Sequence, residues 1–233
     1  MTKKDIVLRI TFSVLVFSVA VLSIFYQLAR LCTDTPLMQN QFIAYSKTEY
    51  TQEKYKIIAE DISQYLSGKK EKLDMAEPNQ DGESLISERE ILHMKDVRGL
   101  VKTGLAFLWP ILLVLLVFLV LLLAHKKGLM YISSKTVEAS YLIGVGAFLL
   151  LLTALAVAYL GDFDGLFEAF HRLLFTNDLW LLNENEDILL QLMPEPFFKS
   201  YAGIFLKRFL PLVACLAMGC FAIIFKGKNK DAK

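Results

Sequence analysis

Four long apolar blocks constrain what this sequence can fold into. They cover residues 6–31, 99–124, 137–160 and 201–225. Each block is long enough to cross a bilayer as a helix, which takes about 20 residues. Inside hydrocarbon every backbone N–H and C=O must be paired within its own segment, so isolated blocks of this kind form helices. The sequence therefore predicts an all-α membrane protein with four transmembrane helices.

The composition and the first block support the same class. Hydrophobic residues make up 55% of the 233 residues, which exceeds the roughly 45–50% of ordinary soluble domains. The block 6–31 is longer than the apolar core of a secretory signal, which runs about 7–15 residues. No small-residue cleavage site follows it, so we expect this helix to stay attached.

Lysine and arginine near the ends of the blocks predict the orientation of the chain. They gather in the amino-terminal tail, in the link 125–136 and in the tail 226–233, and basic ends of this kind stay in the cytoplasm. The link 32–98 holds nine Lys and Arg against thirteen Asp and Glu, and the link 161–200 holds two against eight. We therefore expect both acidic links outside and both chain ends in the cytoplasm. The residues that set this orientation are Lys3, Lys4, Arg9, Lys126, Lys127, Lys135, Lys226, Lys228, Lys230 and Lys233.

The first acidic link contains a second kind of helix. Residues 51–67 place apolar side chains at steps of three and four, and Gly68 follows as a helix end. The apolar stripe needs a partner, which is either the lipid surface or the rest of a small cap. Residues 68–83 are polar, with Pro78 and Gly82, and predict an irregular connection. We expect the outer links to form a small, mainly helical extracytoplasmic cap.

The segment "SEREILHMKDVR", residues 87–98, lies directly before the second block. Ser87 followed by Glu90 is a capping-box pattern, so a helix begins there and runs into that block. On this helix Arg89, His93 and Asp96 share one face at steps of four and three. The face presents a cation, an imidazole and a carboxylate. The same spacing also fits a solvated helix end with ordinary ion pairs.

The second acidic link is rich in aromatic side chains around His171. Asn177 and Asp178 predict a turn after this stretch, and Trp180 follows. Aromatic side chains near a membrane surface commonly serve as interfacial anchors. A histidine among phenylalanines is different, because burial disfavours the charged imidazolium. His171 is therefore expected to be a neutral base near working pH.

Two of these motifs resemble a known enzyme family. "SEREILHMKDVR" before the second block and "FHRLLFTNDLWLLNENEDILLQLMPEPFF" before the fourth are similar to the lipoprotein intramolecular transacylases of Gram-positive bacteria. The resemblance implies a multi-pass acyltransferase of the bacterial cell membrane, with its active site at the outer face and no cofactor. It also implies a substrate, a lipoprotein whose amino-terminal cysteine carries a diacylglyceryl group. The enzyme would move the sn-2 acyl chain to the free α-amine and form a lyso-lipoprotein.

The two histidines of the acidic links suit this chemistry. Aminolysis of an ester needs an amine without its extra proton and a proton for the departing alkoxide, and an imidazole can serve both steps. The hypothesis is that His93 and His171 converge at the outer membrane interface as the catalytic pair. The third histidine, His125, adjoins Lys126 in the link 125–136 and is expected at the opposite interface.

Five further residues are candidates for orienting the pair or binding the substrate. A carboxylate, either Asp96 or Asp178, is expected to hold one imidazole in its tautomer. Either Arg89 or Asn177 is expected to stabilise the tetrahedral oxyanion. Trp180 is expected beside the substrate.

Two other functions remain open from the residues alone. A metal-dependent membrane hydrolase could use His93, Asp96, His171 and Asp178 as ligands, although no HExxH motif is present. A non-catalytic accessory subunit could bind lipid or peptide with the aromatic link.

The sequence contains no basic face with interleaved aromatic residues that would suggest nucleic-acid binding. Cys32, Cys215 and Cys220 suggest neither a disulfide framework nor a zinc site. We expect no metal and no cofactor. The partners expected are lipoproteins and membrane lipid, and the oligomeric state stays open.

Overall fold

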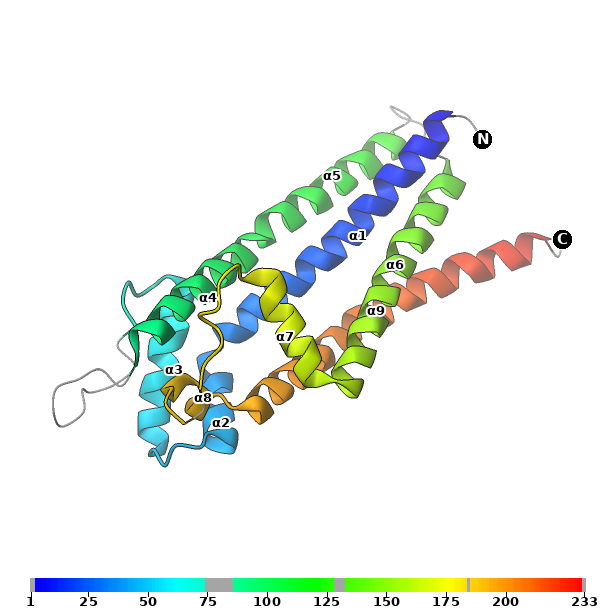
Figure 1. Ribbon diagram of the computed structural model, residues 1–233. Coiled ribbons are helices and arrows are strands. Elements are labelled where there is room, and N and C mark those ends of the chain that lie inside the picture. Colours follow the sequence, from blue (N-terminus) through cyan, green and yellow to red (C-terminus); the bar gives the residue numbers. More distant parts are fainter. Residues whose placement is uncertain (1–2, 74–85, 128–132, 184, 232–233) are drawn as a thin grey trace. The chain divides into compact units, whose positions relative to one another are not determined.

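The computed structural model describes residues 3–73, 86–127, 133–183 and 185–231, and within these ranges it contains helices, turns and irregular segments only (Figure 1). The all-α architecture predicted from the sequence is confirmed. The predicted connection 68–83 lies largely outside the described residues. The helices are α1 (Lys3–Cys32), α2 (Thr35–Tyr45), α3 (Gln52–Ser67), α4 (Glu88–Ala106), α5 (Leu108–Lys126), α6 (Ser134–Gly161), α7 (Phe163–Leu174), α8 (Ile188–Leu192) and α9 (Glu195–Asp231).

Four helical segments are long and apolar enough to cross a membrane. They run over Ile6–Cys32, Glu88–Leu121, Lys135–Gly161 and Glu195–Ile223. Each overlaps one of the apolar blocks, and the second joins most of α5 to the polar helix α4. Leucines and valines on α5 are largely exposed, as expected for side chains that face lipid. The protein is thus an integral membrane protein with four spanning helices.

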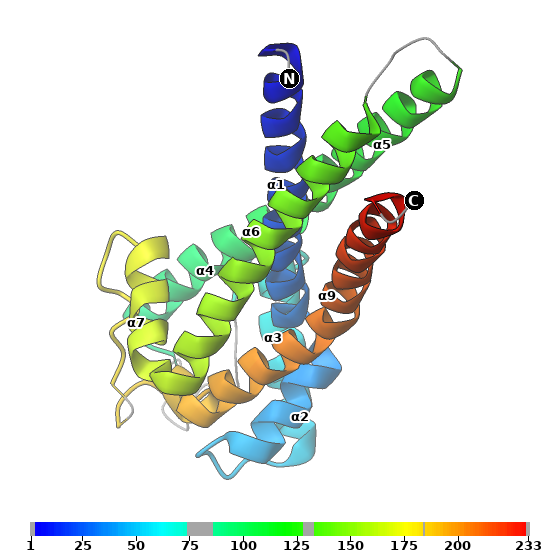
Figure 2. The same cartoon turned by 90° about the vertical axis from the view of Figure 1, so that its right-hand side faces the viewer.

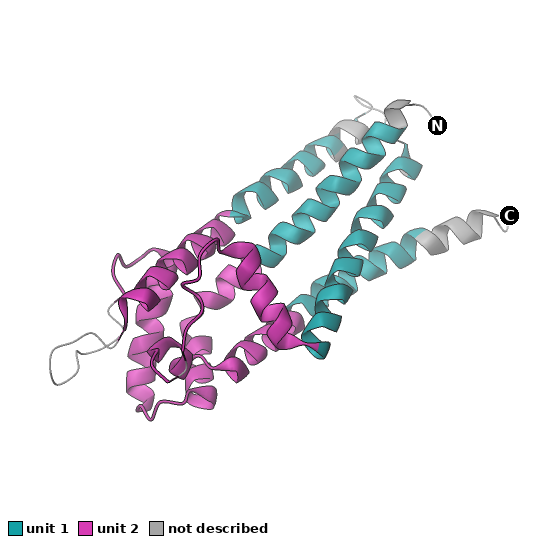
Figure 3. Ribbon diagram, viewed as in Figure 1, with its two compact units in different colours: residues 1–25, 107–161, 208–233 teal, residues 26–106, 162–207 magenta. Residues whose placement is uncertain are grey.

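The chain divides into two compact units, which are coloured separately in Figure 3. The first unit holds most of the apolar length of the spans, and the second holds the short helices together with the adjoining span ends. The first unit comprises residues 1–25, 107–161 and 208–233, and the second comprises residues 26–106 and 162–207.

Within the first unit, α6 packs closely against α1 at a glycine. A Cβ atom on Gly144 would lie 2.8 Å from the carbonyl oxygen of Ser13 and 2.8 Å from the Cβ of Val16. Only a residue without a side chain permits this approach of the backbones, which is the usual way helices associate in lipid. The hydroxyl of Tyr141 donates to the carbonyl of Leu216 at 3.0 Å and joins α6 to α9.

The second unit is built around a compact apolar core. Helices α2 and α3 lie side by side in both views (Figures 1 and 2), and they meet α8 and the start of α9 at Phe42, Ile58, Ile62, Leu192 and Phe197, all fully or almost fully buried. The rings of Phe42 and Phe197 stack at a centroid distance of 5.6 Å. The amphipathic stripe of residues 51–67 is therefore covered by the protein itself, which resolves the choice left open by the sequence.

Helix α3 has the ends that its sequence predicts. The hydroxyl of Thr51 accepts a hydrogen bond from the N–H of Lys54 at 3.2 Å. Gly68 terminates the helix in the left-handed conformation, with φ 81°. Its N–H donates to the carbonyl of Tyr65 at 3.0 Å. A residue with a Cβ adopts this conformation only with strain.

We expect Gly68→Ala to lower the free energy of unfolding by about 1 kcal/mol, because alanine is strained at positive φ. An added Cβ would meet only the flexible side chain of Lys102, at 3.4 Å. Thermal unfolding of the purified protein in detergent measures the loss. Gly99→Ala is the matched control, since Gly99 lies within α4 with open space around it and alanine favours helix by up to about 1 kcal/mol. Equal destabilisation by both changes would refute the conformational explanation.

Candidate active site

Helix α4 begins with the predicted capping box, and this box sets the position of His93. The Ser87 hydroxyl accepts from the N–H of Glu90 at 3.2 Å, and the Glu90 carboxylate accepts from the N–H of Ser87 at 2.7 Å. These two bonds satisfy backbone donors that a helix start leaves unpaired. His93 lies one turn later and is 9% exposed. Its Nδ1 is buried without a hydrogen-bond partner among the described residues.

Helix α7 positions the second histidine. The helix begins after Asp162, whose carboxylate accepts from the N–H of Gly165 at 2.9 Å. His171 lies in its last turn and is 8% exposed. The Nδ1 of His171 is 2.7 Å from the carbonyl oxygen of Phe167. Because a carbonyl only accepts, Nδ1 must carry the proton, and the neutral ring therefore keeps its basic lone pair on Nε2.

The two imidazoles face each other within a cluster of aromatic rings. The ring centroids of His93 and His171 are 6.3 Å apart. Phe175 contacts both, at 5.3 Å from His93 and 5.6 Å from His171. The rings of Phe167 and Trp180 lie 4.1 Å and 5.0 Å from His171. Two separate segments of the chain thus meet at a pair of buried histidines.

The surroundings of His171 determine its charge. Burial among these rings lowers its pKa below the ordinary 6.5, and the hydrogen bond to the Phe167 carbonyl opposes part of this effect. Desolvation prevails because the imidazolium loses more hydration than one carbonyl replaces. The ring is consequently neutral near pH 7, and it is a base with its Nε2 unprotonated.

Two polar contacts tie α4 to the turn after α7. The guanidinium of Arg89 donates through Nη2 to the carbonyl of Asp178 at 2.6 Å. The amide Nδ2 of Asn177 donates to the carboxylate of Asp96 at 2.9 Å. In addition, Asn177 Oδ1 accepts from the N–H of Leu179 at 3.1 Å and shapes the turn. The face of α4 that carries His93 is therefore bound to the segment that follows His171.

A third contact is made by a buried carboxylate. Glu90 is 1% exposed, and besides the N–H of Ser87 it accepts the N–H of Leu189 at 2.7 Å through its other oxygen. The hydroxyl of Ser87 also lies 3.2 Å from the carboxylate of Asp187, the residue that precedes α8. One acidic side chain therefore caps its own helix and fixes a segment that is 99 residues away in the sequence.

The structure brings the seven candidate residues into one region, with one difference in their contacts. Ring contacts join His93, His171 and Trp180, and hydrogen bonds join Arg89 to Asp178 and Asn177 to Asp96. Among the described residues, however, neither Asp96 nor Asp178 is hydrogen-bonded to an imidazole. The tautomer of His171 is set by a main-chain carbonyl instead.

Three contributions to the site were not predicted from the sequence. The carbonyl of Phe167 and the ring of Phe175 have no sequence signal beyond helical spacing and composition. Glu90 was recognised as half of a capping box, but its bond to Leu189 is a tertiary contact that spacing does not reveal. Within the described ranges, no three His, Cys, Asp or Glu side chains gather at a distance suited to a metal ion.

Comparison with known proteins places the chain among membrane enzymes. The profile of the lipoprotein intramolecular transacylase Lit matches residues 6–198. The chain is similar to the membrane-integral lipoprotein intramolecular transacylase Lit of Bacillus cereus, solved in meso, with a TM-score of 0.71 and 18% identity over 94% of this chain and 97% of that chain. A structure of the same protein with a histidine replaced by alanine gives a TM-score of 0.61 and 17% identity over 97% and 96%. No curated protein matches the chain.

We expect Trp180→Ala to raise the pKa of His171 towards 6.5, because removal of the indole admits water to the imidazole. Histidine-selective NMR measures this pKa by pH titration of the labelled protein in detergent. Trp109→Ala is the control, since Trp109 is 73% exposed in α5, and it should leave the titration unchanged. A pKa of His171 at or above 6.5 in the unmodified protein would contradict the role given to burial.

Replacement of Glu90 by alanine should lower the free energy of unfolding by about 3 kcal/mol, because the buried N–H of Leu189 loses its charged acceptor. Glu88→Ala removes an exposed carboxylate from the same helical turn and should change stability by no more than about 0.5 kcal/mol. Denaturant unfolding in detergent compares the two variants. Similar stabilities for both would show that the contact contributes little.

Proposed function

The chain belongs to the family of lipoprotein intramolecular transacylases and is an integral membrane acyltransferase, and we propose that His93 and His171 carry out its acid–base chemistry. The observation that carries this proposal is the approach of two buried imidazoles from different helices, at 6.3 Å between ring centroids. Acyl transfer from an ester to an amine moves one proton from nitrogen to oxygen. Two adjacent imidazoles can accept and return that proton without water or a cofactor.

His171 is the base in this proposal. Its Nδ1–H is bound to the carbonyl of Phe167, so Nε2 is the nitrogen that accepts a proton. Burial keeps the ring neutral by lowering its pKa. A neutral imidazole with a fixed tautomer is the state that a general base requires before the reaction begins.

His93 serves the other partner of the reaction. Its Nδ1 is buried and lacks a hydrogen-bond partner among the described residues, which is unusual for a polar atom and typical of a functional site. We assign this nitrogen to the reacting lipid, where it binds the ester or relays the proton from His171 to the departing glyceryl oxygen. The edge contact with Phe175 holds the ring in place.

The proposed substrate is a lipoprotein whose amino-terminal cysteine bears a diacylglyceryl group and a free α-amine. The α-amine nitrogen attacks the carbonyl carbon of the sn-2 ester, and His171 takes the proton that the nitrogen releases. The tetrahedral intermediate then collapses with cleavage of the bond to the glyceryl oxygen, and the imidazolium of His171 returns its proton to that oxygen, directly or by way of His93. The products are an N-acyl amide and an sn-2 hydroxyl, a lyso-lipoprotein. Because amine and ester belong to one molecule, positioning alone supplies a high effective concentration.

Of the remaining candidate residues, one is assigned to stabilise the oxyanion and two are assigned to position the site. Arg89 is exposed and uses one N–H for the carbonyl of Asp178, so its other N–H groups are assigned to the oxyanion. Asn177 is committed at both ends of its amide, to Asp96 and to Leu179. We therefore give Asn177 and Asp96 the positioning role.

We further propose that this site faces away from the cytoplasm. Both acidic links contribute to it, and the basic segments lie at the other ends of the spans in the sequence. Trp180 and the phenylalanines near His171 then lie at the height of the lipid ester groups, where aromatic side chains are enriched.

His171→Gln and His93→Gln should each reduce formation of the N-acylated product by about 10²–10⁴-fold, the usual contribution of general acid–base catalysis. Mass spectrometry of the amino-terminal peptide of a co-expressed reporter lipoprotein measures the product. His125→Gln is the control, because this third histidine lies in the link predicted to be cytoplasmic. Membrane fractions should contain each variant at the normal level. Full activity in both site variants would end the proposal.

A further inference from the structure

A polar cavity lies in the unit that contains the histidines. It has a volume of about 620 Å³ and is lined by the end of α1, the first half of α2, the middle and end of α3 and the end of α4. Cavities that bind small ligands commonly measure about 300–1,000 Å³. Leu105 of α4 lines this cavity, twelve residues after His93, which corresponds to about 18 Å along the helix axis. The cavity and the proposed active site have no residue in common.

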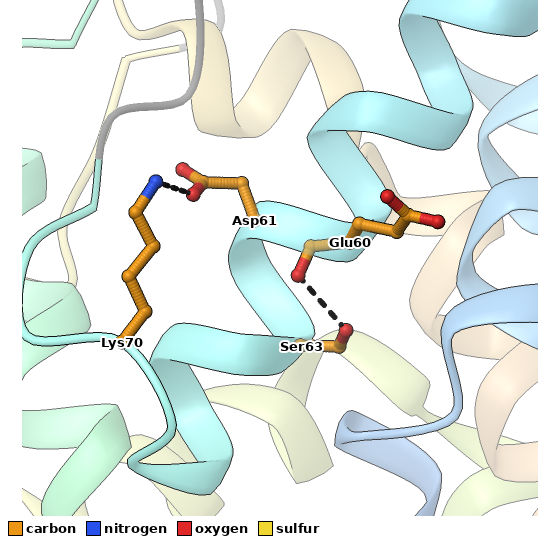
Figure 4. A network of polar contacts seen from close by, with 4 residues as sticks. All are labelled: Glu60, Asp61, Ser63 and Lys70. Carbon is orange, nitrogen blue, oxygen red and sulfur yellow. Dashed lines mark hydrogen bonds and ion pairs between the residues drawn. The ribbon is translucent and has the colours of Figure 1, made fainter.

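The hydroxyls of the cavity are used within the protein. Thr35 and Ser63 pair at 2.5 Å and join α2 to α3. Ser63 donates in turn to the carbonyl of Glu60 at 3.1 Å, as Figure 4 shows. Thr33, which directly follows α1, donates to the carbonyl of Ala29, and Ser67 donates to the carbonyl of Gln64. The hydroxyl groups are therefore already hydrogen-bonded within the protein. The hydrogen-bond donors that remain for a ligand are mainly the cationic side chains.

Three cations line the cavity: Arg30, Lys56 and Lys69. Over the described residues none of them forms an ion pair, whereas neighbouring cations are engaged. Lys70 is paired with Asp61, as seen in Figure 4, and Lys54 lies over the ring of Tyr50. Glu60 is the acidic residue of the lining, so the cavity has an excess of two positive charges. Lys56 and Lys69 belong to the link 32–98, which is acidic overall.

The position of the cavity along the spans indicates which anion it takes. Arg30 lies two residues before the end of the span Ile6–Cys32, and Leu105 lies next to the last residue of the polar helix α4, just before the apolar helix α5 begins. A cavity at the end of a spanning segment is at the level of lipid headgroups, where Lys and Arg attract anionic lipid. The anion that is abundant at this level is the phosphate of a glycerophospholipid. A diacylglyceryl cysteine carries no phosphate, so the ligand is a second lipid.

We propose that this cavity binds the phosphate of an anionic glycerophospholipid through Arg30, Lys56 and Lys69. The bound lipid would hold α2 and α3 against the end of α1 without entering the reaction. The inference goes beyond the transacylase chemistry and does not depend on the roles of the histidines.

The test uses the full-length protein in detergent and soluble short-chain phosphatidylglycerol, with binding followed by titration calorimetry. Lys56→Gln combined with Lys69→Gln should weaken this binding by at least about tenfold, because two of the three cations are removed. Lys47→Gln combined with Lys54→Gln is the matched control, since it removes two cations of the same link that do not line the cavity. It should leave the affinity unchanged. Equal affinity in both double variants would overturn the proposal.

Further ligands identify the source of the phosphate. Inorganic phosphate should bind more weakly than the lipid, and its binding should respond to the same double variant. A short-chain diacylglycerol, which has no phosphate, should show no response to it. If inorganic phosphate bound as tightly as the lipid, the assignment to a lipid would be wrong. It would also be wrong if, of all the ligands tested, only an acidic lipoprotein peptide bound more weakly to the double variant. Lyso-lipoprotein formation by the Lys56 and Lys69 variant should persist, which separates this test from that of the histidines.

Discussion

Two segments that are far apart in the sequence are joined at a carboxylate that solvent scarcely reaches. Glu90 accepts one N–H from Ser87 and one from Leu189. Withdrawal of a carboxylate from water is costly, and hydrogen bonds from main-chain donors offset that cost only when their geometry is good. The contact therefore permits few alternative arrangements of α4 and the segment before α9. His93 lies one turn beyond Glu90, so its place depends directly on this contact.

The same region combines rigid polar ties with an apolar interior. Arg89 and Asn177 hold the turn after α7 from outside, while Phe167, Phe175 and Trp180 surround His171. The polar ties are exposed and their individual contributions to stability are modest. The aromatic rings instead remove water from the imidazole and keep it neutral. Positioning and control of charge thus come from different side chains.

Local sequence patterns were sufficient for much of this structure. Apolar length predicted the spanning helices, and Ser87 with Glu90 and Thr51 with Gly68 predicted helix ends that the structure contains. Such signals work because caps and periodicity act within a few residues. The approach of His93 and His171 was expected from the family resemblance, since spacing carries no information about contacts over 78 residues. The hydrogen-bond partner of His171, the carbonyl of Phe167, was not predicted. Every residue has a main-chain carbonyl, so no residue type in the sequence indicates which one is used.

That partner has a consequence for how the site can vary. The acceptor that orients His171 belongs to the peptide bond of residue 167, so exchange of the side chain at that position leaves it in place. A substitution at residue 167 can change the packing of the aromatic rings. The orientation of the imidazole is kept, because the carbonyl that accepts its hydrogen bond is part of the helix backbone. A carboxylate in the same role would be lost by a single nucleotide change.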